Sequence, residues 1–414
     1  MFNILKLSDD GKTLFGVWDK SVNRIEIPYG VTSIESDTFE NCTSLQHVGI
    51  PSSILSIESY AFCNCSSLQR VYIPASCIKR SAFSCCNSLQ SIYITHQVKN
   101  IEENAFNHCY SLHTIDVSYD NQYFASINGV LFGKSLSTLL RYPSGRKTIT
   151  YNIPNSVTSI GYMAFEGCAS LESVNIPNSV FSIDKYAFLG CSSLQSINIP
   201  GNVLSIRHGA FQNCSSLKRV DFYLPYNRIR VLESAIFSGC ASLQNICIPD
   251  SVDEIGSVCF SGCTLLRSVD IPNSVKTIHD GAFEDCISLQ SIDLPNSIKV
   301  INDWVFKGCI SLQSIRIPNG VRYISGYAFS GCSSLKEIYI PSSVIGIGER
   351  AFEKCTSIKS IHLHSMTVEM LDIKANAFDV DVEECTLYVP IGAQSTYRSH
   401  PFLGKFKNIV ELYL

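Results

Sequence analysis

The chain repeats an Ile-Pro pair at an interval of 23 residues. Ile50-Pro51 is followed by Ile73-Pro74, and Ile153-Pro154 is followed by Ile176-Pro177. A single unit of this length cannot bury its own apolar face, so neighbouring units must stack and share one core. The period therefore predicts a solenoid, and the 414 residues are expected to form one elongated domain instead of several globular ones.

The repeat unit can be written I-P-x-S-V-x-S-I-x-x-x-A-F-x-x-C-x-S-L-x-S-V-x, and thirteen copies are recognisable. In residues 171–176 apolar side chains occupy the first, fourth and sixth places, which predicts a strand of a parallel sheet. Pro177 ends this strand because proline has no N–H to donate. Residues 179–183 predict a second short strand, and residues 186–191 are too few for more than a helical turn. Each coil is thus expected to run strand, bend, short strand, turn.

Two side chains recur in columns along the repeats. One phenylalanine per coil, mostly preceded by alanine, is expected to fill the coil interior. Thirteen of the nineteen cysteines fall one per coil at a single place, where a free cysteine acts as a small hydrophobe. Nineteen is an odd number, so complete disulfide pairing within the chain is impossible. We expect the repeat cysteines to be reduced, buried and free of metal.

The run I-P-x-S-V-x-S-I-x-x-x-A-F-x-x-C-x-S-L resembles the BspA-like leucine-rich repeat, also called the Treponema-type repeat, over nearly the whole chain. The resemblance implies a β-rich solenoid, a right-handed superhelix of coils of about 23 residues with a parallel sheet and short helical turns. It also implies a bacterial surface or secreted protein that binds host or matrix proteins or supports adhesion. It supplies no fixed functional residues.

The repeat is interrupted in ways that divide the chain into five segments. Residues 1–26 are expected to form an N-terminal cap hairpin, and residues 27–116 and 153–362 to form leucine-rich repeats. Residues 117–152 contain Asn128-Gly129 between apolar runs and predict a hairpin insertion. Residues 363–414 lose the pattern and are expected to form a C-terminal cap, since a terminal coil must cover its open face.

Composition and charge exclude several classes of partner. The net charge is -4, and Lys and Arg are scattered, so no nucleic-acid partner is expected. No stretch approaches the eighteen apolar residues of a membrane span, so no membrane insertion is expected. The first residues lack the basic and apolar regions of a signal peptide, and no targeting segment is expected in this chain.

Sequence motifs for catalysis are absent, and neither an enzyme nor a cofactor is expected. The regular serines of the repeat are interpreted as structural. One group of side chains could hold zinc on stacked turns, but its spacing fits no standard site and ordinary packing with surface thiols is favoured. Its members are Cys63, Cys65, Cys77, Cys85, Cys86 and His108.

The positions that vary most in chemistry are those expected to face outward from the long strand of each coil. In L-x-x-V-x-I the fifth place points away from the core, and this row also includes Gly49, Cys247 and His362. A solvated face with no partner is the alternative interpretation, but solenoids bind partners along such a face and tyrosine is common in interface anchors. The predicted ligand-binding residues are Tyr72, Tyr93, Asp116, Asn175, Asn198, Asp221, Asp270, Asp293, Arg316 and Tyr339.

The sequence therefore favours a non-enzymatic scaffold that binds a protein ligand, displayed at the cell surface or secreted as the resemblance implies. A cytoplasmic interaction or sensor protein is the alternative, consistent with the missing leader and the free thiols. A third interpretation is a structural protein that self-assembles weakly through its ends. A monomer is expected otherwise.

Overall fold

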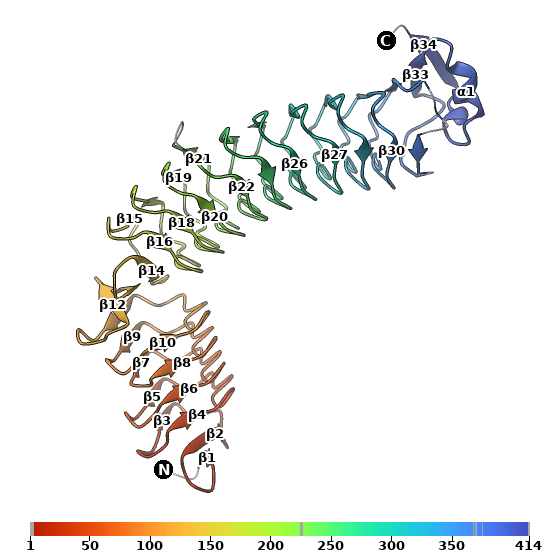
Figure 1. The fold of residues 1–414 in the computed structure, drawn as a ribbon. Helices are drawn as coiled ribbons and strands as arrows, with labels where there is room; N and C mark the ends of the chain where they lie inside the picture. The colour runs from red at the N-terminus through yellow and green to blue at the C-terminus, as the bar shows by residue number, and fades with distance from the viewer. Residues whose placement is uncertain (1–3, 224–226, 367, 369–370, 375, 413–414) are drawn as a thin grey trace. The chain divides into compact units, whose positions relative to one another are not determined.

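The computed structural model describes residues 4–223, 227–366, 368, 371–374 and 376–412. The chain forms two compact units, Met1–Leu194 and Gln195–Leu414. Each unit is a stack of short coils in which strands of successive coils pair in parallel (Figure 1). Paired residues such as Ser159 and Ser182 lie 23 positions apart, which confirms the predicted leucine-rich repeat solenoid. The repeat is unbroken at Leu194, so the sequence, which predicts one elongated domain, carries no signal for this division.

In the first unit each regular coil contributes one strand to a long-strand ladder and one to a short-strand ladder. The long-strand ladder consists of β3 (Arg24–Glu26), β5 (His47–Gly49), β7 (Arg70–Ile73), β9 (Ser91–Ile94) and β11 (Thr114–Val117), followed after the insertion by β15 (Thr150–Asn152) and β17 (Ser173–Asn175). The short-strand ladder consists of β2 (Thr13–Val17), β4 (Ser33–Ile34), β6 (Ser56–Ile57), β8 (Cys77–Ile78) and β10 (Asn100–Ile101), followed by β14 (Thr138–Arg141), β16 (Ser159–Ile160) and β18 (Ser182–Ile183).

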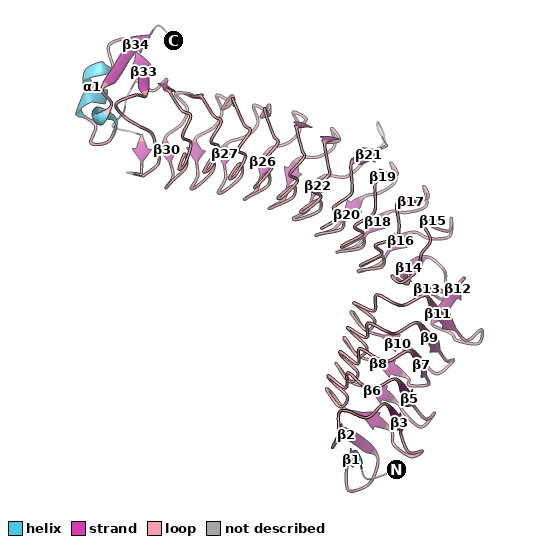
Figure 2. Cartoon of the chain, turned by 180° about the vertical axis from the view of Figure 1, so that it is seen from behind, coloured by secondary structure: helices cyan, strands magenta, loops and turns pink. Residues whose placement is uncertain are grey.

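The second unit repeats this arrangement. Its long strands are β19 (Ser196–Ile199), β21 (Arg219–Phe222), β23 (Asn245–Cys247), β25 (Ser268–Asp270), β29 (Glu337–Ile340), β31 (Ser360–Leu363), β33 (Thr386–Pro390) and β34 (Asn408–Leu412). Its short strands are β20 (Ser205–Ile206), β22 (Val231–Leu232), β24 (Glu254–Ile255), β26 (Thr277–Ile278), β27 (Val300–Ile301), β28 (Tyr323–Ile324), β30 (Gly346–Ile347) and β32 (Asp372–Ile373). The helix α1 (Gln394–Ser399) and the 3-10 helix η3 (Leu403–Lys405) lie near the C-terminus (Figure 2).

The phenylalanine column forms the centre of each stack. In the first unit the Phe165 and Phe188 rings are stacked with centroids 4.7 Å apart, and in the second unit Phe260 and Phe283 are stacked at 5.3 Å. All four side chains are fully buried. The small alanine before most of these rings lets adjacent coils approach closely, because close packing of the interior leaves no room for a larger neighbour.

The cysteine column has a polar role that packing alone does not describe. The Cys65 thiol donates to the carbonyl oxygen of Phe39 at 3.2 Å, and the Cys286 thiol donates to the carbonyl oxygen of Phe260 at 3.2 Å. Each of these carbonyl groups already accepts from a backbone N–H of its own coil, from Cys42 and Cys263, and the S–H group adds a second donor from the following coil. Cysteine at this place is therefore both a small core residue and a hydrogen-bond donor between coils.

The turn before each cysteine requires left-handed backbone. The residue preceding the cysteine has φ 61° at Asn41, 58° at Asn64 and 59° at Asn213, and φ 69° at Gly190. Glycine and asparagine tolerate this conformation better than other residues. The asparagines of the three Asn-x-Ser/Thr triplets that begin at Asn41, Asn64 and Asn213 thus have a backbone explanation.

The stretch 117–152 forms antiparallel structure inside the parallel stack. β12 (Phe124–Ile127) and β13 (Val130–Gly133) pair antiparallel around Asn128 and Gly129, and β13 pairs antiparallel with β14. β14 then pairs in parallel with β16, so the hairpin rejoins the short-strand ladder. The short-strand ladder that ends at β10 and the one that contains β14 are separate sheets.

The two ends of the chain cover the core differently. At the N-terminal end β1 (Leu5–Leu7) pairs antiparallel with β2. At the C-terminal end Phe402 stacks on Phe378 with ring centroids 6.0 Å apart, and Tyr397 is fully buried with its hydroxyl donating to the carbonyl oxygen of Ser365 at 2.8 Å. Aromatic side chains therefore continue the interior beyond the last regular coil.

Candidate ligand-binding face

The outward row of the long strands is set by strand geometry. Along β7 the exposure alternates, with Val71 and Ile73 buried and Tyr72 exposed. Successive side chains of a strand point to opposite faces, so the residue between two core positions must face out. We call the fifth-place residues of the long strands the outward row.

In the first unit the outward row brings three predicted residues together. Tyr72 pairs with Tyr93, and Tyr93 pairs with Asp116 in the next coil. The two tyrosine rings are stacked with centroids 5.3 Å apart and are 57% and 40% exposed. Asp116 is exposed and accepts a hydrogen bond from the Thr114 hydroxyl at 3.1 Å. The result is a rigid aromatic pair beside a carboxylate.

The hairpin insertion breaks this row. Asn175 is exposed, but it lies on β17 and pairs with Asn152 of β15. β15 and β11 belong to separate sheets, so Asn175 does not continue the ladder that carries Asp116. The sequence pattern places these residues in one row, whereas the structure separates them.

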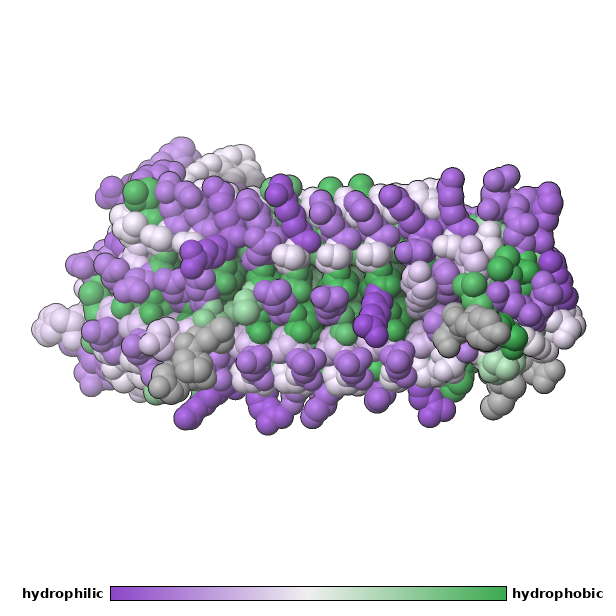
Figure 3. All heavy atoms as spheres, turned by 90° about the horizontal axis from the view of Figure 1, so that it is seen from above, coloured by the Kyte–Doolittle hydropathy of each residue, from purple (hydrophilic) through white to green (hydrophobic). Residues whose placement is uncertain are grey.

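In the second unit the outward row is polar in the middle and aromatic at its end. Asn198 pairs with Asp221, and Cys247 pairs with Asp270. Farther along, isolated bridges connect residues of three successive coils in the order Asp293, Arg316 and Tyr339. Figure 3, viewed from the side of β19 and β21 in Figure 1, shows rows of hydrophilic side chains on either side of a band where apolar residues are visible.

The three predicted acidic residues in the second-unit part of this row differ in their ion pairing. The Asp221 carboxylate is held by Arg219, whose Nε lies 2.7 Å from Asp221 Oδ1. Asp270 and Asp293 are exposed, and among the described residues neither side chain has a hydrogen-bond or ion-pair partner. Two of the three carboxylates are therefore available to a basic partner, and Asp221 is already neutralised.

His362, near the end of the outward row, is buried instead of exposed. The fifth-place rule puts His362 on the outward face, but only 9% of it is exposed because its ring lies between two tyrosines. The His362 centroid is 4.1 Å from that of Tyr339 and 4.5 Å from that of Tyr388. Burial lowers the pKa of His362, so the ring is neutral near pH 7. Tyr388, which pairs with His362 in register, extends the row into the C-terminal segment.

The structure contains an ionic cluster of Arg141, Glu166 and His108 that the sequence did not predict. Arg141 Nη2 lies 2.7 Å from Glu166 Oε2, and His108 Nδ1 lies 2.9 Å from Glu166 Oε1 and 2.8 Å from the Tyr110 hydroxyl. Burial opposes ionisation of Glu166, but the His108 hydrogen bond and Arg141 outweigh it and lower the pKa of Glu166 to about 2. The hydrogen bond to Glu166 raises the pKa of His108.

The location of this cluster explains why it exists. In regular coils the turn residue before the cysteine donates to a backbone carbonyl of the next coil, as Cys85 N–H does to Asn107 at 2.9 Å. At the insertion, His108 N–H donates instead to Glu166 Oε2 at 3.3 Å. The carboxylate thus replaces a backbone acceptor, and Arg141 neutralises its charge. Glu166 and His108 stand at variable positions of the repeat and Arg141 lies in the insertion, so the interruption of the repeat was the available signal.

The cysteine and histidine side chains considered as zinc ligands do not form a ligand cluster. In the part of the chain that the structure describes, no three His, Cys, Asp or Glu side chains converge as metal ligands would. Burial, with a smaller effect of Cys85, raises the pKa of Cys63 to about 11. A neutral thiol is a poor nucleophile and a poor metal ligand, because both roles require the thiolate.

Comparison with known proteins agrees with the repeat geometry. The chain matches the family described as "BspA type Leucine rich repeat region (6 copies)" over residues 13–135, 144–267 and 254–381. The chain belongs to the BspA-type leucine-rich repeat family. A comparison with curated proteins finds no match.

Several solved structures resemble this BspA-type chain. A leucine-rich cell surface protein from Faecalibacterium prausnitzii has a TM-score of 0.55 and 30% identity, with 87% of this chain and 93% of that chain covered. A leucine-rich repeat protein from Bacteroides ovatus has a TM-score of 0.57 and 26% identity, with 94% and 98% covered. One from Eubacterium ventriosum has a TM-score of 0.58 and 23% identity, with 79% and 92% covered, and shows the fold alone.

BspA-type repeats provide a scaffold. Within the described residues, none of the helices has the length and apolar composition needed to cross a bilayer.

Proposed function

We propose that this BspA-type protein is a non-enzymatic scaffold that binds a protein ligand on the outward row of its long strands. The observation that carries the proposal is the state of Asp270 and Asp293, two exposed carboxylates that have no hydrogen-bond or ion-pair partner among the described residues. Asp270 pairs in parallel with Cys247, and Asp293 pairs in parallel with Arg316. Tyr339 lies on the same ladder two coils beyond Asp293 and supplies amphipathic contact area.

The proposed ligand is a protein with a basic surface. Carboxylates on an exposed face raise the association rate of a positively charged partner, and aromatic side chains provide the buried contacts that hold it. In the second unit, Asn198 and Arg316 are proposed to contribute further polar contacts. In the first unit, Tyr72, Tyr93, Asp116 and Asn175 are proposed to contribute aromatic and polar contacts of their own. The other row residue, Asp221, contributes less because Arg219 neutralises it.

For location, we propose display at the bacterial cell surface or secretion, with a role in adhesion or in binding host or matrix proteins. The support is family membership and the Faecalibacterium prausnitzii relative, which is described as a leucine-rich cell surface protein. An intracellular interaction protein is the second candidate. The observation that favours it is that all nineteen cysteines are free, since disulfides are common in oxidising compartments.

The proposal is tested with a double variant, Asp270→Asn with Asp293→Asn, against immobilised host matrix proteins. We expect the association rate constant to fall about three- to tenfold at low salt and its salt dependence to flatten, because steering charges act over a Debye length. Asp280→Asn is the matched control, since it removes an exposed carboxylate of the second unit that lies in a turn outside the outward row, and its effect should be smaller.

The melting temperature of the double variant should equal that of the parent, because Asp270 and Asp293 are exposed. Equal association rates for parent, double variant and a Tyr339→Ala variant would place the binding surface elsewhere. Absence of binding to any surface or matrix protein, together with binding to a protein from the organism's own cytoplasm, would favour the intracellular candidate.

A further inference from the structure

The short-strand ladder of the first unit has a gap at the insertion. β10 pairs with β8, and it is the last strand of its sheet, whereas β14 pairs with β13 and β16 in a separate sheet. In regular parts of the ladder the strand of the next coil covers this edge. Between β10 and β14 no such strand pairing exists among the described residues. The insertion therefore leaves an opening in the wall of the coil stack.

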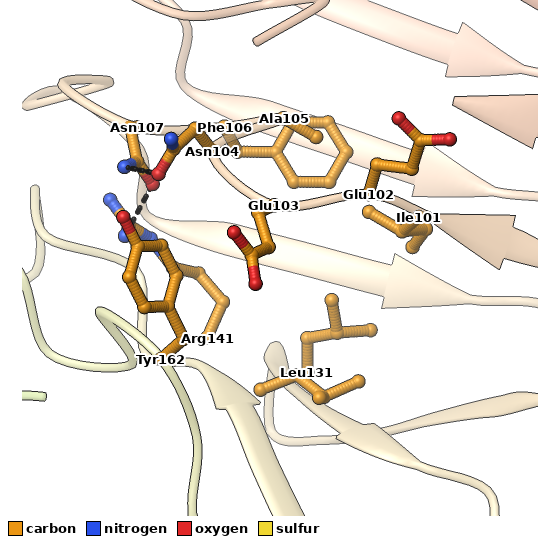
Figure 4. A pocket seen from close by; sticks show the side chains of 11 residues that line it. Ile101, Glu102, Glu103, Asn104, Ala105, Phe106, Asn107, Leu131, Arg141 and Tyr162 are labelled. Atoms are coloured by element: carbon orange, nitrogen blue, oxygen red, sulfur yellow. Dashed lines mark hydrogen bonds between the residues drawn. The ribbon is translucent and has the colours of Figure 1, made fainter. Parts of the chain in front are cut away.

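A cavity of about 150 Å³ occupies this gap (Figure 4). One part of its wall is apolar and consists of Ile101, Ala105, Phe106, Leu131 and Leu140, and the rest carries polar groups. Figure 4 shows the Glu103 side chain pointing between Tyr162 and Leu131. Cavities of roughly this volume, ~150 Å³, accommodate a molecule of the size of benzene.

Glu103 is the acidic group of this cavity that lacks a partner. The other carboxylate in the wall, Glu102, lies 3.0 Å from Lys79 Nζ and accepts a backbone hydrogen bond from Arg80 at 3.0 Å. The Glu103 side chain has no hydrogen bond or ion pair with any described residue. An unpaired carboxylate beside an apolar wall and an aromatic ring is complementary to a cation with an apolar stem.

The positive charge nearest to this carboxylate in the cavity wall does not oppose such a ligand. Arg141 lines the cavity, but the residue is only 5% exposed. Its guanidinium is bonded to Glu166, to the Asn107 side chain at 3.2 Å and to the Met163 carbonyl at 2.8 Å. Its charge is therefore compensated inside the protein. Asn107 also donates to Asn104 at 2.6 Å, so the polar end of the cavity is held by internal bonds.

We infer that this cavity binds an alkylammonium or alkylguanidinium group, with the charge on Glu103 and against the Tyr162 ring and the apolar stem on Leu131 and Leu140. Such a group occurs in free amines and in the lysine and arginine side chains of proteins. The site lies in the short-strand ladder and is independent of the proposed outward row.

The inference is tested on the full chain by titration with pentylammonium, followed by NMR of isotope-labelled isoleucine and leucine methyl groups. We expect saturable shifts of the Ile101, Leu131 and Leu140 signals. 1-Pentanol, which has the same stem without a charge, should bind about five- to tenfold more weakly, and Glu103→Gln should weaken pentylammonium binding about fivefold. Glu40→Gln is the matched control, since it removes a carboxylate of the same unit that is not in the cavity wall.

One further probe separates the sources of the cation. A capped Gly-Lys-Gly peptide that shifts the same signals would indicate a protein side chain, and binding of pentylammonium alone would indicate a free amine. Equal affinity for pentylammonium and 1-pentanol, or no effect of Glu103→Gln, would overturn the inference. Unchanged methyl signals with all probes would overturn it as well, whereas failure of the outward-row variants to alter protein binding would leave it intact.

Discussion

At the residue scale, the coil interior depends on one aromatic ring per coil. Phe283 is fully buried, with ring centroids 5.3 Å from Phe260 and 5.7 Å from Phe306. Its removal opens a void that neither neighbour can fill, because each is fixed by its own coil. The sequence predicts this role from the regular position of the ring.

We expect Phe283→Ala to reduce the free energy of unfolding by about 3–5 kcal/mol. Phe15→Ala is the control, because Phe15 is 53% exposed and its loss should change stability by less than about 1 kcal/mol. Urea denaturation followed by circular dichroism measures both. Equal denaturation midpoints for the two variants would contradict the central role of the ring column.

Glu166 makes stability depend on pH at the residue scale. Its pKa in the folded protein is about 2, below the usual 4.5, so its contribution is present above pH 4.5 and is lost as the pH falls from about 4.5 to about 2. The contribution is on the order of 3 kcal/mol. His108 has a raised pKa, so its contribution is present below pH 6.5 and is lost at higher pH. The cluster should stabilise the fold most between about pH 4.5 and 6.5.

The measurement is the urea midpoint of parent and Glu166→Gln between pH 3 and 8. The difference between the two proteins should be largest at pH 5 to 6 and should shrink at lower pH, where Glu166 of the unfolded parent becomes protonated while Glu166 of the folded parent is still ionised. A difference that stays constant from pH 6 to pH 3 would show that Glu166 acts by shape alone.

At the element scale, the inserted hairpin is fixed by its turn. Asn128 has φ 49° and Gly129 has φ 72°, and a Cβ added to Gly129 would lie 2.3 Å from Thr114 Oγ1. The turn therefore packs against β11, and its glycine is required for both conformation and space. The same hairpin separates the two parts of the outward row and opens the cavity beside β10, so one element decides both candidate sites.

Gly129→Ala should destabilise the first unit by about 1–2 kcal/mol, from the left-handed backbone and the close contact with Thr114. Gly133→Ala is the matched control, since an added Cβ there meets no atom within 4 Å. Hydrogen exchange of β12 and β13 amides reports the effect locally. Faster exchange in both variants, or in neither, would contradict this explanation of the turn.

At the scale of the whole molecule, no disulfide bonds connect the coils. All nineteen cysteines are free, and four of them, Cys63, Cys77, Cys85 and Cys247, are not buried. The cysteines of the repeat column instead connect coils by thiol-to-carbonyl hydrogen bonds. Stability thus follows from the packing of neighbouring coils, as expected for a repeat protein.

Thiol titration of the native protein should therefore detect about four groups, and titration in denaturant should detect nineteen. Burial strongly raises the pKa of thiols such as Cys286, which keeps them protonated and slow to react. Intact mass of the denatured protein, with and without reductant, provides the second measurement. A mass deficit that corresponds to several disulfides, or native labelling of most cysteines, would contradict the structure.

The sequence by itself determined what depends on spacing along the chain. A repeat of 23 residues requires stacked coils, and alternation within each strand requires that Tyr72 and Asp270 face outward, because both follow from local backbone geometry. The tertiary structure decided what depends on which side chains meet between coils. Arg219 neutralises Asp221, Tyr388 covers His362, and Arg141 reaches Glu166 across the insertion, since side-chain directions and distances between coils are not encoded by spacing. The cavity at Glu103 exists for the same reason, because it is the space that the hairpin leaves uncovered.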